Sequence, residues 1–158
     1  MLHLFHWPVP DALPAELQAV CTELRAAKTQ EECLRRAYDI VSRRFRASRA
    51  HTYILLHKIL RKNVDRLWKQ RGFLHCTHLN QFVKILLVYS GWFAPGDIRA
   101  RWTLVSGVSP HQYLRVRMKD GRHMDVDVWG RTYGVPLGKH ARGFNTTVFP
   151  VWKEGGKN

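Results

Sequence analysis

Two kinds of hydrophobic spacing divide the chain. In the first half, apolar residues recur three or four positions apart, as along one face of an α-helix, and predict helices over 14–27, 29–45 and roughly 54–70. In the second half, apolar and polar residues alternate, as along a β-strand, and predict strands over 98–107, 111–118 and 123–129. Helices followed by antiparallel strands are typical of an α+β fold. We therefore predict a single α+β domain spanning residues 1–158.

One segment is apolar on nearly every side. After Cys76, five apolar residues share one helical face: Leu79, Phe82, Val83, Leu86 and Leu87. Three more cover much of the remaining surface: Ile85, Val88 and Tyr89. A helix that is apolar all round is buried, and Ser90-Gly91 offers this one a C-terminal cap. The sequence therefore predicts a buried central helix with Cys76 at its N-terminus.

The composition adds a strong positive charge to this picture. The formal net charge is +14 at pH 7, and the isoelectric point is about 10.4. Basic residues gather at 35–49 and 58–71, and further arginines lie in the predicted strands. Such a field attracts polyanions. A nucleic-acid partner, an acidic substrate and a solvated basic surface all stay open.

The sequence shows no membrane segment and no export signal. A membrane-spanning helix needs roughly 20 mostly apolar residues, and no apolar run approaches that length. The opening MLHLFHWPVP is too short for the apolar part of a secretory signal and lacks a basic start. We therefore expect a cytoplasmic protein without a membrane span, and its oligomeric state stays open.

The three cysteines fall into two classes. Their odd number argues against a disulfide framework. Cys21 and Cys33 occupy apolar helical positions, so we expect them to be small core residues. Cys76 differs because it begins the buried helix and stands between His75 and His78. A core thiol, a metal ligand and a nucleophile are the three interpretations of Cys76.

A zinc site would draw on His75, Cys76 and His78, with His111 or His123 as the fourth ligand. Structural zinc sites usually hold paired Cys or His residues at defined loop spacings. This chain has no second cysteine pair, and the cluster would have to open a helix while binding the metal. We therefore predict no metal and no cofactor.

A nucleophile at this position has a physical basis. The dipole and the free N–H groups of a helix N-terminus favour a thiolate. A nucleophilic cysteine also needs a base, and the base needs a group that orients it. The predicted strands supply both residue types, because His111 opens one strand while Asp125 and Asp127 lie on the next.

The turn between these strands decides which aspartate reaches His111. The loop KDG at 119–121 suits a three-residue connection with glycine in the left-handed position. That register pairs Met118 with Arg122 and makes His111 and Asp127 diagonal neighbours on one face, about 7–8 Å apart. A two-residue turn would place His111 and Asp127 on opposite faces.

The same register gives Asp125 a different partner. It places Asp125 opposite Arg115, one row further from His111, and it places Trp129 opposite His111. Opposite charges that face each other across two strands attract. We therefore predict that Asp125 forms a structural salt bridge with Arg115.

In order and spacing, Cys76, His111 and Asp127 resemble the transglutaminase-like branch of the papain-type cysteine enzymes. The resemblance covers about residues 57–130 and rests on RGFLHCTHLNQFVKILLVYSG, IRARWTLVSG, HQYLRVRM and VDV at 126–128. It implies a fold in which a central helix carries the cysteine. That helix packs on an antiparallel sheet that carries the histidine and the aspartate.

The resemblance also implies roles. Cys76 is then the nucleophile, His111 the general base and acid, and Asp127 the residue that orients His111. Gln70, six residues before Cys76, resembles the oxyanion-hole glutamine of papain-like enzymes. The glycine-rich segment 130–145 is a candidate wall of the cleft.

Members of this superfamily hydrolyse or transfer acyl groups at peptide or side-chain amides without a metal. The resemblance therefore favours an enzyme: a cysteine-dependent hydrolase or acyltransferase that acts on a protein or peptide substrate through a thioester. The positive charge is compatible with an acidic substrate. It leaves one alternative open, a catalytically inactive module of the same fold that binds nucleic acid or another polyanion.

Overall fold

The computed structural model describes residues 8–147 and 149 and has the mixed α+β composition that the hydrophobic spacing predicts. Its α-helices are α1 (Ala15–Arg25), α2 (Gln30–Arg44), α3 (Arg49–Ile54), α4 (Val64–Lys69), α5 (Cys76–Tyr89) and α6 (Val128–Thr132). Short 3-10 helices are η2 (Leu56–Leu60) and η3 (Pro95–Asp97). The strands are β1 (Phe45–Arg46), β2 (Gly72–Phe73), β3 (Ile98–Val105), β4 (Ser109–Arg117) and β5 (His123–Val126). Within the described residues, no helix combines the length and the apolar character needed to cross a bilayer.

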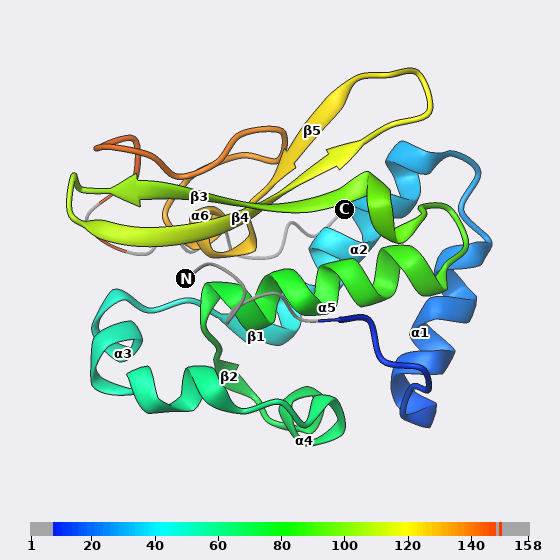
Figure 1. The fold of residues 1–158 in the computed structure, drawn as a ribbon, viewed down its shortest axis with the longest axis horizontal. Helices are drawn as coiled ribbons and strands as arrows, with labels where there is room; N and C mark the ends of the chain where they lie inside the picture. The colour runs from blue at the N-terminus through cyan, green and yellow to red at the C-terminus, as the bar shows by residue number, and fades with distance from the viewer. Residues whose placement is uncertain (1–7, 148, 150–158) are drawn as a thin grey trace, which may run out of the picture.

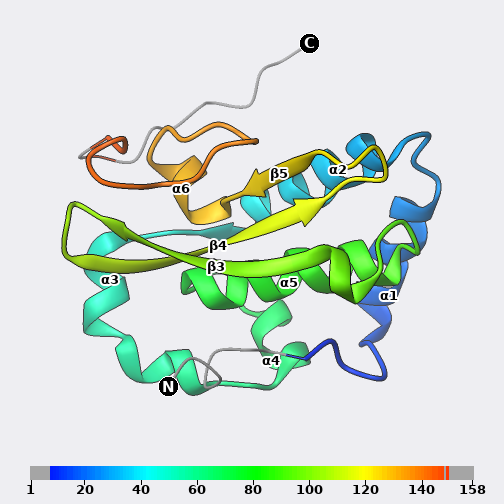
Figure 2. The same cartoon turned by 45° about the horizontal axis from the view of Figure 1, so that its top comes forward.

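Helix α5 lies at the centre of the molecule. It contacts α1, α2, α6 and strand β4 (Figure 1), and Figure 2 shows the sheet on one side of it and α4 on the other. Phe82, Leu86 and Leu87 have no exposed surface. The helix begins at Cys76, and Gly91 follows it with a left-handed φ of 80°. The predicted buried central helix is confirmed.

The sheet has the predicted register at its hairpin. Strands β3, β4 and β5 are antiparallel and lie in that order. The amide of Met118 donates to the carbonyl of Arg122 at 2.8 Å, which closes the loop. Gly121 has a φ of 84°, a conformation that favours glycine. Arg115 is paired with Asp125 across the two strands, so the register inferred from the KDG loop is confirmed.

The hairpin is shorter than predicted at its far end. Strand β5 stops at Val126, because Asp127 starts helix α6 instead of extending the sheet. The Asp127 carboxylate accepts the amide of Gly130 at 2.7 Å, and aspartate is a favoured N-cap residue. The prediction that Asp127 and Trp129 belong to the second strand and pair with residues of the first is therefore wrong. A helix begins there instead.

The predicted helix over 54–70 is also wrong. Three short pieces, α3, η2 and α4, replace it. The side-chain oxygen of Asn63 accepts the amide of Arg66 at 2.8 Å and starts α4 inside the expected helix. A side-chain oxygen that caps backbone amides competes with helix continuation. The apolar residues of the expected stripe therefore divide, and Ile54 and Leu60 stay exposed while Leu67 is buried.

Helices α1 and α2 pack their apolar stripes against α5. The buried residues of α1 are Leu17, Cys21 and Leu24, and the apolar ones of α2 are Cys33, Leu34, Ala37, Tyr38 and Val41. Burial raises the pKa of the Cys21 thiol to about 11, and burial also raises that of Cys33. Both thiols therefore stay protonated at neutral pH, and the prediction that they are core residues is confirmed.

A short parallel strand pair positions the start of α5. Strand β1 follows α2 directly and pairs with β2, which ends shortly before Cys76. The amide of Leu74 then donates to the carbonyl of Arg46 at 3.2 Å. The pair ties α2 to the segment that leads into Cys76.

Candidate active site

Cys76 is the first residue of α5. Its neighbour His75 occupies the cap position without a side-chain cap hydrogen bond. The first amides of a helix have no intrahelical acceptor, and here the cap side chain supplies none either. Cys76 is half-buried, whereas Cys21 and Cys33 are fully buried. Cys76 is thus the accessible thiol of the three.

The two histidines beside Cys76 point to the preceding segment. Nε2 of His75 donates to the carbonyl of Leu55 at 2.9 Å, and Nε2 of His78 donates to the carbonyl of Arg61 at 3.0 Å. Burial lowers the pKa of His75 and lowers that of His78 to about 4, so both rings are neutral near pH 7. Across residues 8–147 and 149, no group of three His, Cys, Asp or Glu side chains is placed to hold a metal ion.

His111 and Asp127 form a buried hydrogen-bonded pair. Nε2 of His111 lies 2.8 Å from Oδ2 of Asp127. The two residues are 3% and 1% exposed. The contact inferred from the hairpin register therefore exists, although Asp127 reaches it from a helix cap. Because Nε2 of His111 is bonded to Asp127, Nδ1 is the ring nitrogen that remains available to Cys76.

The carboxylate of Asp127 is held from three sides. Besides His111, the amide of Gly130 donates to Oδ1 at 2.7 Å and the amide of Ala141 donates to Oδ2 at 2.8 Å. A Cβ atom on residue 130 would lie 2.6 Å from Oδ2 of Asp127. Glycine at this position therefore lets the carboxylate sit against the start of α6, and the hydrogen bonds fix its orientation toward His111.

The surroundings of His111 favour its charged form. Burial by itself lowers the pKa of His111. The charge and hydrogen bond of Asp127, with the hydrogen bond and negative charge of Cys76, outweigh burial and raise the pKa of His111 to about 10. His111 is therefore an imidazolium near neutral pH, in contact with Cys76 and Asp127. A neighbouring imidazolium stabilises a cysteine thiolate.

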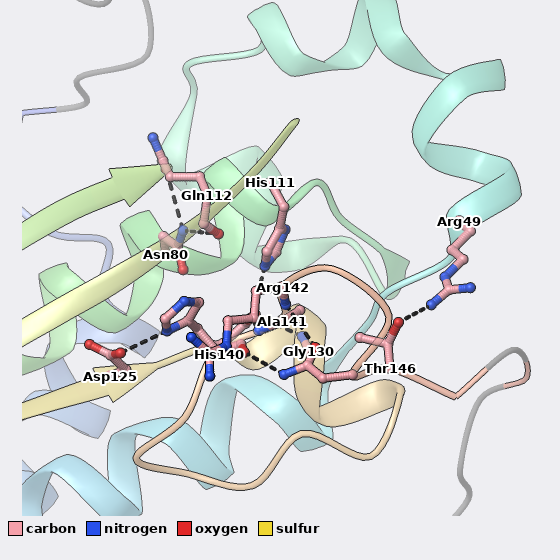
Figure 3. Close-up of polar contacts among 12 residues, drawn as sticks. Arg49, Asn80, His111, Gln112, Asp125, Gly130, His140, Ala141, Arg142 and Thr146 are labelled. Carbon is pink, nitrogen blue, oxygen red and sulfur yellow. Dashed lines mark hydrogen bonds and ion pairs between the residues drawn. The ribbon is translucent and has the colours of Figure 1, made fainter. Parts of the chain in front are cut away.

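Two further contacts lie at His111 and beside it. The predicted register placed Trp129 opposite His111, whereas sequence reasoning did not single out Asn80. The ring of Trp129 packs on the ring of His111 with 4.7 Å between centroids. Asn80 of α5 donates to the backbone carbonyl of Gln112 at 2.8 Å and to its side-chain oxygen at 3.3 Å (Figure 3). This joins α5, one turn beyond Cys76, to β4 beside His111. A polar side chain inside a buried helix needs a hydrogen-bond partner, and that signal could have singled out Asn80.

A cavity of about 100 Å³ contains the reactive groups. Cys76, His111 and Trp129 line it together with residues of α3 and of the β3–β4 turn. The hydroxyl of Tyr53 donates to Oγ of Ser109 at 2.6 Å, which links α3 to β4 across the cavity lining. A carbonyl group that enters this space meets the thiol and the imidazole together.

Gln70 and the segment 130–145 lie outside this lining. The side-chain amide of Gln70 donates to the carbonyl of Phe73 at 3.4 Å. Neither Gln70 nor any residue of 130–145 is among the residues that line the cavity. The segment instead supports the site from outside, because the amide of Ala141 holds Asp127.

A second histidine–aspartate pair lies near the first. Nδ1 of His140 is 2.7 Å from Oδ2 of Asp125 (Figure 3). Arg115 binds both oxygens of Asp125, at 2.8 and 3.0 Å, so the predicted salt bridge is confirmed. Burial acts to raise the pKa of Asp125, but the hydrogen bonds from Arg115 and His140 outweigh it and lower that pKa. His140 also stacks on Tyr113 with 4.0 Å between ring centroids.

Comparisons with known proteins give no relative for this chain. No protein-family model, no curated protein and no solved structure matches it.

Proposed function

We propose that the protein is a cysteine-dependent hydrolase or acyltransferase that acts on peptide or side-chain amides through a thioester on Cys76. One observation carries the proposal: Cys76 and His111 line the same cavity, and His111 is hydrogen-bonded to the buried carboxylate of Asp127. A nucleophile, a base in contact with it and a group that orients the base are the parts that such acyl transfer requires.

The arrangement of elements supports the finer assignment, a transglutaminase-like core. Helix α5 carries Cys76 and contacts β4. Strand β4 carries His111, and Asp127 follows the end of β5. A cysteine on a central helix and a histidine on an antiparallel sheet are the features that the sequence resemblance implies.

The first half of the reaction forms the thioester. The Cys76 thiolate attacks the carbonyl carbon, so that a C–S bond forms and the carbonyl π electrons move to oxygen. As this intermediate collapses, the C–N bond breaks and His111 donates its proton to the leaving amine. Asp127 keeps the imidazole ring in position and stabilises its charged form. A thioester on Cys76 and a neutral His111 remain.

The second half releases the acyl group. Water, or an amine in a transfer reaction, attacks the thioester carbonyl. His111 takes a proton from the attacking group as general base. The C–S bond breaks, the acid or the new amide leaves, and the thiolate–imidazolium pair is restored.

The negative oxygen of each intermediate needs hydrogen-bond donors, and one such donor is worth about 2.7–4 kcal/mol. The backbone amide of Cys76 suits this role because it opens a 14-residue helix whose cap side chain does not engage it. Gln70 stays a prediction for the second donor. Its side chain does not line the cavity, so the side chain has to move in order to serve.

An activated ester tests the proposal without knowledge of the natural substrate. Incubation with p-nitrophenyl acetate should release nitrophenolate and leave an acetyl group on Cys76, detected by peptide mass spectrometry. Cys76→Ala should abolish the adduct, and Cys21→Ala, which removes a buried thiol, should keep it. Acetylation of wild-type protein no faster at Cys76 than at Cys21 and Cys33 contradicts the proposal.

The net charge of +14 supports a second candidate, a catalytically inactive module that binds nucleic acid or another polyanion on this fold. Some of the basic side chains already have an acidic partner, since Arg35 pairs with Glu31 and Arg36 pairs with Glu32. On this alternative, Cys76→Ala leaves every measurable activity intact. Arg→Ala changes within 35–49 or 58–71 should then remove salt-sensitive nucleic-acid binding.

A further inference from the structure

Arg49 has surroundings unlike those of similarly buried arginines. The half-buried arginines of the described residues are Arg44, Arg49, Arg115 and Arg131. Three of them pair with a carboxylate: Arg44 with Glu16, Arg115 with Asp125, and Arg131 with Asp39. Arg49 has no carboxylate within ion-pair distance in the part of the chain that the structure describes. A charge withdrawn from water is costly unless it is paired.

Uncharged groups hold the guanidinium of Arg49 in place. Its Cζ lies 4.5 Å from the centroid of the Tyr133 ring, and Nη2 donates to the hydroxyl of Thr146 (Figure 3). Its Nε is buried and has no hydrogen-bond partner among the described residues. The cation is thus positioned by its neighbours while part of its donor capacity stays unused.

Arg49 is a lining residue of the cavity that contains Cys76. Arg49, Cys76 and His111 are all lining residues, and no aspartate or glutamate of the described chain is among them. The cavity volume is about 100 Å³, so it admits only the reacting end of a substrate. An anion in this space would meet Arg49 without competition from an acidic side chain.

We propose that Arg49 binds a carboxylate of the substrate, so that the enzyme selects acyl compounds with a carboxylate close to the reacting carbonyl. A guanidinium presents parallel N–H donors that match the two oxygens of a carboxylate. The inference rests on the proposed function and names the substrate class of that same site. It makes Arg49 a specificity-determining residue that the sequence did not single out.

Two small alkylating reagents test this inference directly. Iodoacetate and iodoacetamide both react by forming a C–S bond and releasing iodide. Iodoacetate carries a charged carboxylate where iodoacetamide carries an uncharged carboxamide. The rate of Cys76 labelling by iodoacetate is divided by the rate with iodoacetamide. The same ratio in the urea-unfolded protein corrects for the intrinsic reactivity of the reagents. We expect the corrected ratio to exceed one and to fall about tenfold in Arg49→Gln.

A matched variant controls for the general positive field. Arg61 is exposed and does not line the cavity, so Arg61→Gln removes the same charge outside it. Its ratio should stay near that of the wild type. An unchanged ratio in Arg49→Gln, or an equal fall in Arg61→Gln, overturns the inference and leaves the nucleophile intact. Labelling of Cys76 by both reagents no faster than Cys21 overturns the proposed function and the inference with it.

Arg49→Gln also removes the contacts of Arg49 with Tyr133 and Thr146 and so lowers the stability of the variant. A second measurement therefore uses the wild-type protein. Propionate and propionamide have similar size and differ in charge. Propionate should slow iodoacetamide labelling of Cys76 more than propionamide does at equal ionic strength. Equal protection by the two compounds overturns the inference.

Discussion

Two histidine–aspartate pairs lie near the end of β5, and their surroundings differ. His111 and Asp127 are buried, at 3% and 1% exposure. His140 and Asp125 are both half-buried. Each pair has a hydrogen-bond distance below 3 Å, 2.8 Å in the first and 2.7 Å in the second. Distance within the pair therefore does not by itself assign a role to either pair.

The other partners of each carboxylate make the difference. Arg115 binds both oxygens of Asp125, so that carboxylate is already neutralised by a permanent cation. Asp127 receives His111 and two uncharged backbone amides. Its charge therefore acts on the imidazole, and the pKa of His111 rises to about 10 against the effect of burial. Under the proposed function, this pair is the catalytic one, because Cys76 lines the same cavity as His111.

Replacement of each aspartate by asparagine should give the largest difference in kcat between the two pairs. Asp127→Asn leaves His111 without its carboxylate and should lower kcat for ester or amide cleavage roughly ten-thousand-fold, as loss of the orienting carboxylate does in related triads. The matched variant Asp125→Asn should leave kcat within a few-fold of the wild type. Steady-state kinetics on both variants checks this, and loss of activity in Asp125→Asn alone would reverse the assignment of the two pairs.

Substitution of Gly130 should give a smaller loss through position alone. A methyl group at residue 130 would lie 2.6 Å from the Asp127 carboxylate, so the carboxylate has to move away from His111. A misplacement of about 1 Å costs roughly hundred-fold in rate. Gly130→Ala should therefore lower kcat by about that factor and also lower the pKa of His111, measured by NMR titration.

Gly96→Ala is the matched control for that substitution. A Cβ atom there has no neighbour within 4 Å, and the residue has no positive φ. The variant should keep wild-type kcat and the wild-type pKa of His111. A wild-type pKa of His111 in Gly130→Ala would show that the carboxylate tolerates the added methyl group and would contradict this prediction.

The buried pair should also make stability depend on pH. The pKa of His111 is about 10 in the folded protein against 6.5 for an unperturbed histidine, so between these values the folded state binds more protons than the unfolded state. Its contribution is complete below pH 6.5 and is lost as pH rises through about 10. The free energy of unfolding from urea titrations should fall across this window. His111→Gln should have a weaker dependence, and an equal slope in both proteins contradicts the raised pKa.

The second pair should show the smallest effect. His140→Gln removes one hydrogen bond to Asp125 while Arg115 still neutralises the carboxylate. We expect a loss of about 1 kcal/mol in the free energy of unfolding with little change in kcat. A loss of kcat as large as that of Gly130→Ala would place His140 in the reaction.

The sequence predicts the site well where local periodicity and turn chemistry agree. The segment after Cys76 is apolar on nearly every side, so as a helix it is stable only when buried. The KDG loop sets the register that brings His111 toward Asp127. Periodicity does not show where a strand gives way to a helix. The cap at Asp127 depends on a side-chain hydrogen bond with Gly130, which has no hydrophobic signature.

Long-range contacts explain what the sequence could not give. Ala141 holds Asp127 through a backbone amide, which any residue type would supply. Arg49 reaches the cavity from the first turn of α3, which Ser48 caps and which the expected helix over 54–70 does not include. Tertiary packing and local caps override a helical stripe when its apolar residues find no common face to bury.

The most direct test of the central claim is the reactivity of the three cysteines in the folded protein. Iodoacetamide labelling near pH 7, followed by peptide mass spectrometry, gives a rate for each thiol. Cys76 should label much faster than Cys21 and Cys33, because it is half-buried beside an imidazolium while they are buried with raised pKa values. Equal and slow labelling of all three would contradict the claim that Cys76 is a nucleophile.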